Sequence, residues 1–148
     1  MSSTYLSLHY HLVFSTKDRV PFIEPSWRPR LHEYLGGTVM GLGGFPQGAS
    51  GVADHVHLLV GLKATHCLAD FLRELKKASS GWVHDAIGVR RFAWQEGYAA
   101  FTVSAPARAA VKRYIAGQEA HHRNRTFREE LVELLEKAGV VYDRRYLD

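Results

Sequence analysis

The chain has 148 residues, of which 46% are hydrophobic and 23% charged, as is ordinary for a globular protein. This length can form one hydrophobic core without stabilising disulfides or bound metals, so residues 1–148 are expected to form a single domain. One cysteine excludes an intrachain disulfide framework, no apolar stretch approaches the ~20 residues that span a bilayer, and the start lacks a signal-peptide layout, so the sequence predicts a cytoplasmic protein without a membrane segment. The net charge of +4 is compatible with a polyanionic partner but does not require one.

The first half of the chain predicts a strand, a helix and a hairpin. Residues 6–16 alternate in polarity, as a strand with one buried face does. A proline-rich turn leads into a helix that Ser26 could cap. The glycine-rich stretch 41–51 predicts a loose loop and a short second strand. A third strand over residues 55–62 follows directly, with Asp54 at the hairpin turn.

The second half predicts a long helix, a fourth strand and two further helices. Residues 68–86 place their apolar side chains on one helical stripe. Residues 92–104 are expected to form a strand with a kink at Gly97. A helix over residues 104–122 follows, with a proline in its first turn.

The end of the chain predicts a last helix with clear boundaries. Thr126 and Glu129 have the spacing of a capping box, and Gly139 ends the helix. The order of strands and helices is therefore βαββαβ followed by two helices. The simplest such architecture is an α+β, ferredoxin-like sandwich with an antiparallel sheet and C-terminal helices added to it. This fold alone does not assign an activity.

Two histidines, His55 and His57, lie inside the apolar run of the third strand. Alternate residues of a strand face the same side, so their Cα atoms should lie roughly 6.5 to 7 Å apart. That distance allows both imidazoles to bind one metal ion. The alternative is a histidine pair at a wet strand edge, and His9 and His11 repeat the same pattern in the first strand without an evident purpose.

Tyr114 and Gln118 are four residues apart on a predicted helix, so both side chains leave the same face. Alone, a tyrosine on a helix is typical of the core or its edge, and a glutamine is typical of solvated surface. Two imidazoles and an amide oxygen, however, can hold a divalent ion and leave positions open for phosphate oxygens. A phenol near such a cation can attack phosphate, and the phosphotyrosine bond stores the backbone linkage so that DNA can be rejoined without ATP.

The chain resembles the HUH endonuclease superfamily, specifically the single-tyrosine (Y1) transposases of the IS200/IS605 type and their REP-associated relatives. YHLVFSTKDRVP (10–21) resembles the opening strand of that family and the basic turn after it. Five further stretches match in order: DHVHLLVGL (54–62), FAWQEGYAAFTVS (92–104), YIAGQEAHH (114–122), TFREE (126–130) and YDRRYL (142–147).

The resemblance implies a function and a set of roles. It implies that His55, His57 and Gln118 bind Mg²⁺ or Mn²⁺, and that Tyr114 attacks the phosphate to give a 5′-phosphotyrosine and a free 3′ hydroxyl. It also implies a transposase that acts on single-stranded DNA with hairpin ends, without a small-molecule cofactor. Homodimers are expected, and the active site could form within one chain or between two.

Basic side chains near the candidate site are the expected phosphate contacts, namely Lys17, Arg19, Arg73, Lys76, Lys77 and Arg113. Two other functions stay open. A domesticated, non-catalytic protein could bind single-stranded nucleic acid by charge and aromatic stacking. A metal-dependent hydrolase could use water in place of the tyrosine. The target hairpin, the mobility of the element and the physiological metal are not encoded in any recognisable pattern.

Overall fold

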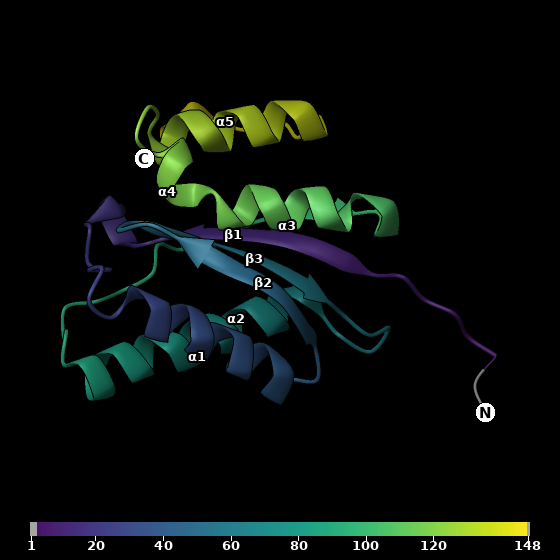
Figure 1. The fold of residues 1–148 in the computed structure, drawn as a ribbon, viewed down its shortest axis with the longest axis horizontal. Helices are drawn as coiled ribbons and strands as arrows, with labels where there is room; N and C mark the ends of the chain where they lie inside the picture. Colours follow the sequence, from purple (N-terminus) through teal and green to yellow (C-terminus); the bar gives the residue numbers. More distant parts are fainter. Residues whose placement is uncertain (1–2, 148) are drawn as a thin grey trace.

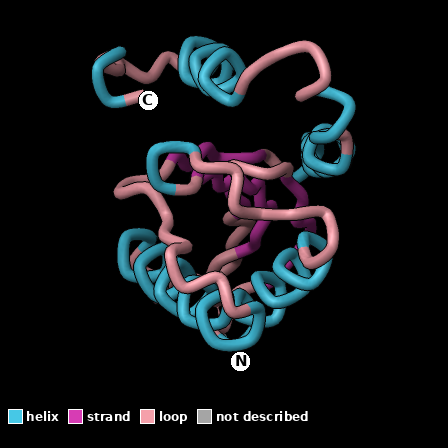
Figure 2. The backbone as a smooth tube through the Cα atoms, turned by 90° about the vertical axis from the view of Figure 1, so that its left-hand side faces the viewer, coloured by secondary structure: helices cyan, strands magenta, loops and turns pink. Residues whose placement is uncertain are grey.

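The computed structural model describes residues 3–147, and it has three layers (Figure 1). A four-stranded sheet forms the middle layer. Two helices cover one of its faces, α1 (Arg28–Gly41) and α2 (Leu68–Trp82). The helices that follow the last strand lie on the opposite face, α3 (Arg108–Ala116), α4 (Gln118–His121) and α5 (Phe127–Ala138). The same layering is visible end-on in Figure 2.

The sheet has the order β2-β3-β1-β4, and all its neighbouring strands are antiparallel. Its strands are β1 (His9–Ser15), β2 (Phe45–Gly51), β3 (His55–Gly61) and β4 (Ala99–Val103). Together with α1 and α2 they form the predicted βαββαβ unit, which confirms the α+β, ferredoxin-like architecture with added C-terminal helices. Among the described residues, no helix has the length and apolar character needed to cross a bilayer.

The two central strands are buried on both faces, which explains their nearly continuous apolar sequence. One face of each contributes to the main core under α1 and α2, through side chains such as Leu12, Phe14, Val56 and Leu58. The alternate residues, including both histidines of β3, face the C-terminal helices instead. A smaller apolar cluster of Leu59, Val103 and Ile115 holds α3 against this second face.

The predicted fourth strand is shorter than expected. Only Ala99–Val103 is a strand, while the residues before it form an irregular connection. Gly97 has φ +88°, a left-handed conformation that interrupts the strand. The Nζ of Lys76 donates hydrogen bonds to the carbonyls of Gln95 and Gly97, which holds this connection on α2.

Several predicted boundaries were also wrong. The helix expected over 104–122 consists of a 3₁₀ turn (Ala105–Ala107), α3 and α4, with a break at Gly117. Trp27, without a side-chain bond, occupies the N-cap position that Ser26 was expected to fill. The α-helical part of the long helix ends at Trp82 and continues as a π-helical turn (Val83–Ile87). The short second strand expected in the glycine-rich stretch is present as β2, which pairs along β3 and ends at Gly51.

Candidate active site

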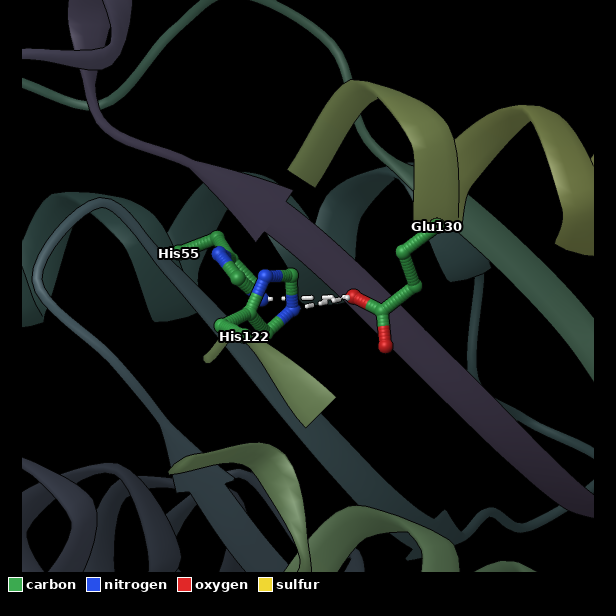
Figure 3. A group of neighbouring side chains, drawn as sticks. All are labelled: His55, His122 and Glu130. Carbon is green, nitrogen blue, oxygen red and sulfur yellow. Dashed lines mark hydrogen bonds and ion pairs between the residues drawn. The ribbon is translucent and has the colours of Figure 1, made fainter. Parts of the chain in front are cut away.

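Three imidazoles converge on one carboxylate on the sheet face covered by the C-terminal helices. His55 and His57 come from β3, His122 follows α4, and Glu130 lies on α5. Glu130 Oε1 lies 3.4 Å from His55 Nε2, 3.0 Å from His57 Nε2 and 3.0 Å from His122 Nε2. Figure 3 shows His55 and His122 pointing at Glu130. The side chains of His55, His57 and Glu130 are fully buried, so water does not compete for these contacts.

The other nitrogen of each imidazole is held from outside this centre. His55 Nδ1 donates to Asp54 Oδ1 at 2.8 Å, and His122 Nδ1 donates to the backbone carbonyl of Arg125 at 2.9 Å. His57 Nδ1 lies 2.7 Å from Nε2 of His11. All three rings therefore present Nε2 inward and are oriented through Nδ1, the usual arrangement of histidines that bind a metal.

Tyr114 and Gln118 face the same carboxylate from α3 and α4. The hydroxyl of Tyr114 donates a hydrogen bond to Glu130 Oε2, and Gln118 Nε2 donates to that oxygen at 3.0 Å. Gln118 Oε1 accepts from His55 Nε2 at 3.1 Å. Arg125 Nη2 donates to the tyrosine oxygen at 3.2 Å. The structure thus brings the four residues expected from the sequence together around a carboxylate that the sequence had not singled out.

Burial and hydrogen bonding determine the charges of this cluster. Burial alone would raise the pKa of Glu130, but hydrogen bonds from His55 and His57 outweigh it and hold the pKa well below its usual range. Burial and the hydrogen bond to the Glu130 carboxylate raise the pKa of Tyr114, so the phenol is protonated. Burial lowers the pKa of His57 despite the neighbouring carboxylate. The ionised Glu130 carboxylate is therefore surrounded by hydrogen-bond donors from imidazoles, a phenol and an amide.

The start of α5 fixes the position of this carboxylate. The predicted capping box is confirmed, because Thr126 Oγ1 accepts from the Glu129 backbone N–H and the Glu129 carboxylate accepts from the Thr126 backbone N–H. Phe127, directly after Thr126, stacks on the ring of His55 with 4.3 Å between ring centroids. Glu130 follows three residues later, on the same face of α5 as Phe127.

The donor set fits a divalent cation. One ligand atom each of His55, His122 and Glu130 lies within 4.8 Å of the others, close enough to share one ion. His57 Nε2 lies outside this group of three but 3.0 Å from Glu130 Oε1, and Gln118 Oε1 lies 3.1 Å from His55 Nε2. Imidazoles suit first-row transition metals, while a carboxylate and an amide oxygen also suit Mg²⁺ and Mn²⁺.

The sequence interpretation missed several residues of this cluster. His11 had no assigned purpose, and Asp54 was explained by turn chemistry alone, although each orients one histidine of β3. Glu130 lies in the TFREE stretch that resembles the family but was given no role of its own, and neither was Arg125. The available signal for Glu130 was its spacing from Phe127 and Leu134, which places a carboxylate on the apolar face of an amphipathic helix.

The predicted phosphate contacts lie on both sides of the sheet. Arg73, Lys76 and Lys77 belong to α2, on the face opposite the cluster (Figure 1). Arg73 is ion-paired with Asp70, and Lys76 binds the backbone carbonyls before β4. These α2 side chains are therefore not part of the cluster.

Arg19 and Arg113 lie nearer to the cluster. The guanidinium of Arg19 lies 5.7 Å from the ring centroid of Phe127, on the turn Lys17–Arg19 that follows β1. Arg113 is exposed on α3, next to Tyr114. An open groove of about 950 Å³ runs past Asp54 and His122, and its lining includes three arginines, Arg28, Arg123 and Arg125, and three acidic residues, Asp54, Glu119 and Glu129.

Comparisons with known proteins place this arrangement in a family. The family model for IS200-like transposases matches residues 4–118. A Deinococcus radiodurans R1 protein, provisionally described as a transposase, has a crystal structure that is 27% identical, with a TM-score of 0.65 over 80% of this chain and 96% of its own. No curated protein matches the chain.

A second solved structure supports the fold at lower identity. It is a REP-associated tyrosine transposase bound to a REP hairpin, 14% identical with a TM-score of 0.59 over 82% of this chain and 74% of its own. The fold is therefore shared well beyond recognisable sequence identity. Since the family model covers well over half of its residues, the chain belongs to the family of IS200-like transposases.

Proposed function

We propose that this transposase binds single-stranded DNA with hairpin ends, and that it cleaves and rejoins the strand through a 5′-phosphotyrosine intermediate on Tyr114. The observation that carries the proposal is one shared contact. The carboxylate that accepts the hydrogen bond from Tyr114 also lies within 3.4 Å of both histidines of β3. A nucleophile and a cation-binding pair are thus adjacent within one chain.

In this proposal His55, His57 and Gln118 hold Mg²⁺ or Mn²⁺. A bound divalent cation would polarise the scissile phosphate and neutralise the charge that develops on it. The phenol of Tyr114 loses its proton as its oxygen forms a bond to phosphorus, the bond from phosphorus to O3′ breaks, and O3′ takes up a proton to become a free 3′ hydroxyl. Arg125, which donates to the phenol oxygen, stabilises its negative charge. Attack by another 3′ hydroxyl on the phosphotyrosine rejoins DNA.

The arginines in the groove beside Asp54 and His122 could contact the phosphate groups of a DNA strand. The fold neighbour bound to a REP hairpin supports hairpin-ended DNA. We propose Lys17, Arg19 and Arg113 as phosphate contacts near the cleavage site. The proposed contacts on α2, Arg73, Lys76 and Lys77, could serve only DNA that passes to the other face of the sheet.

We also propose that residues 1–148 act as a single domain, as a homodimer and in the cytoplasm. The packing of helices on both faces of one sheet supports the single domain (Figure 2). Because Tyr114 lies beside His57 of the same chain, with 6.0 Å between ring centroids, we favour an active site formed within each chain.

Trapping the covalent intermediate tests the catalytic proposal. The protein is incubated with hairpin-ended single-stranded DNA, labelled at its 3′ end, and Mn²⁺. The wild type should form a denaturant-resistant adduct that carries the label, and Tyr114→Phe should form none. Tyr142→Phe is the matched control, because Tyr142 is bonded to Glu136 away from the cluster and should react like the wild type.

Other outcomes would assign this protein a different nucleophile or a different function. Equal adduct formation by Tyr114→Phe and the wild type would refute the assigned nucleophile. DNA cut without an adduct would indicate a metal-dependent hydrolase. Binding that is indifferent to EDTA, with neither cut nor adduct, would indicate the alternative function, a domesticated, non-catalytic protein that binds single-stranded nucleic acid.

A further inference from the structure

We infer that His122 and Glu130 complete the proposed cation site, and that the completed site prefers a first-row transition-metal ion to Mg²⁺. The inference rests on the proposed function, because it adds ligands to a cation that the function requires. Both residues lie beyond Gln118, where the match to the family model ends. The assignment therefore comes from the geometry of this chain.

His122 is placed as the histidines of β3 are placed. Its Nε2 lies 3.0 Å from Glu130 Oε1, the same distance as Nε2 of His57. Its ring centroid lies 4.5 Å from that of His55, and Figure 3 shows both rings pointing at the carboxylate. Its Nδ1 is bonded to the Arg125 carbonyl, so Nε2 is the atom available to a ligand inside the cluster.

Glu130 supplies the negative charge that this group of donors lacks. Its side chain has no solvent exposure, and an isolated buried carboxylate is costly unless cations or hydrogen-bond donors compensate it. A divalent cation between Oε1 and the imidazoles gives that compensation. Oε2 remains bonded to Tyr114 and Gln118, so one carboxylate can hold the cation and position the nucleophile.

The ligand atoms determine the preferred metal. His55, His57 and His122 offer three imidazole nitrogens, alongside the Glu130 carboxylate and the Gln118 amide oxygen. Mg²⁺ prefers oxygen ligands and keeps several of its waters, whereas imidazole suits first-row transition metals, of which Mn²⁺ is the one that also suits carboxylate and amide oxygens. A site so rich in nitrogen should therefore discriminate against Mg²⁺.

Calorimetric titration with MnCl₂ and MgCl₂ tests the inference. The wild type should bind Mn²⁺ at least tenfold more tightly than Mg²⁺. Glu130→Gln and His122→Asn should each weaken Mn²⁺ binding at least tenfold. Two neighbours that do not contact the carboxylate are the matched controls: Glu136→Gln on the same helix, and His121→Asn beside His122, both expected within twofold of the wild type.

A spectroscopic count of coupled nitrogens gives a second readout. Electron spin-echo modulation of Mn²⁺ bound to the wild type should detect three coupled imidazole nitrogens. Two nitrogens would show that one of the three imidazoles is not a ligand, and an unchanged count in His122→Asn would overturn the assignment of His122. If Glu130→Gln does not fold in EDTA, Glu130→Asp replaces it, because a carboxylate shortened by one methylene should also bind Mn²⁺ at least tenfold more weakly.

The outcomes separate this inference from the proposed function. Wild-type Mn²⁺ affinity in both Glu130→Gln, or its replacement, and His122→Asn would overturn the inference while the tyrosine mechanism stands. Equal affinity of the wild type for Mn²⁺ and Mg²⁺ would overturn the metal preference. No Mn²⁺ binding by the wild type would remove the proposed cation site itself, and the inference with it.

Discussion

His11 shows how a single residue of this site gains its role from a neighbour in space. It is buried in β1, and its ring stacks on that of His57 with 5.0 Å between centroids. Burial, with the nearby charge of His57, lowers the pKa of His11 to about 3. Nε2 of a neutral His11 can form one hydrogen bond with Nδ1 of His57. That bond fixes which nitrogen of the His57 ring faces the cation site.

Removing Nε2 of His11 should weaken cation binding without removing a ligand of the cation. We expect His11→Phe to reduce Mn²⁺ affinity by about 10–100-fold, because groups that hydrogen-bond and orient metal-binding histidines have effects of that size. Calorimetric titration measures the change. His9→Phe is the matched control, since His9 lies on the same strand but contacts Gln47. Equal Mn²⁺ affinities for the two variants would contradict the role of His11.

The residues of this site differ in how far the sequence alone can predict them. His55 and His57 share one strand, and Tyr114 and Gln118 lie about one helical turn apart, so spacing indicated them as candidates while the resemblance implied their roles. The role of Glu130 depends on a contact with His57 across 73 residues, and that contact exists only once α5 packs over the sheet. The local pattern places Glu130 on the apolar face of α5, but it does not identify the histidines that this carboxylate contacts.

At the scale of elements, local sequence patterns predicted the two central strands and the start of the last helix. The alternation of β1 and β3 and the capping box of α5 each depend on a few neighbouring residues, and the structure has them as expected. The break at Gly117 was missed. Apolar spacing continues through it, whereas its backbone N–H is shared between the carbonyls of Arg113 and Tyr114 as at a helix end.

The hairpin between β2 and β3 depends on a glycine that the sequence did not single out. A Cβ atom on Gly51 would lie 2.2 Å from the carbonyl oxygen of His55 and 2.9 Å from Cα of Val56. Neither backbone atom can move without shifting the turn that carries Asp54. Gly51 is therefore required where β2 approaches the start of β3.

We expect Gly51→Ala to lower the free energy of unfolding by about 3 kcal/mol, at the upper end of the range for overpacking. Urea denaturation measures the change. Gly48→Ala, on the same strand, is the control, because its Cβ would meet Lys112 Cγ at 3.6 Å, an ordinary contact. Its cost should stay below about 1 kcal/mol. Equal unfolding midpoints for the two variants would refute the close approach at Gly51.

At the scale of the whole molecule, the site is assembled from elements far apart in sequence. The two central strands provide one wall, and the helices after β4 provide the other (Figure 1). Residues from β1, β3, α3, α4 and α5 meet within a single chain. The arrangement therefore contains a candidate nucleophile and cation ligands without a contribution from a second copy.

Complementation between inactive chains tests whether each chain acts alone. Tyr114→Phe and His57→Ala are mixed under conditions that exchange subunits, with a size tag on the His57→Ala chain. A site formed within one chain predicts no adduct above that of either variant, since no chain has both residues. A site shared between two chains would restore about a quarter of the wild-type adduct by random pairing, all of it on the tagged chain. That result would require the tyrosine-bearing helix to cross to its partner and would refute the single-chain assembly.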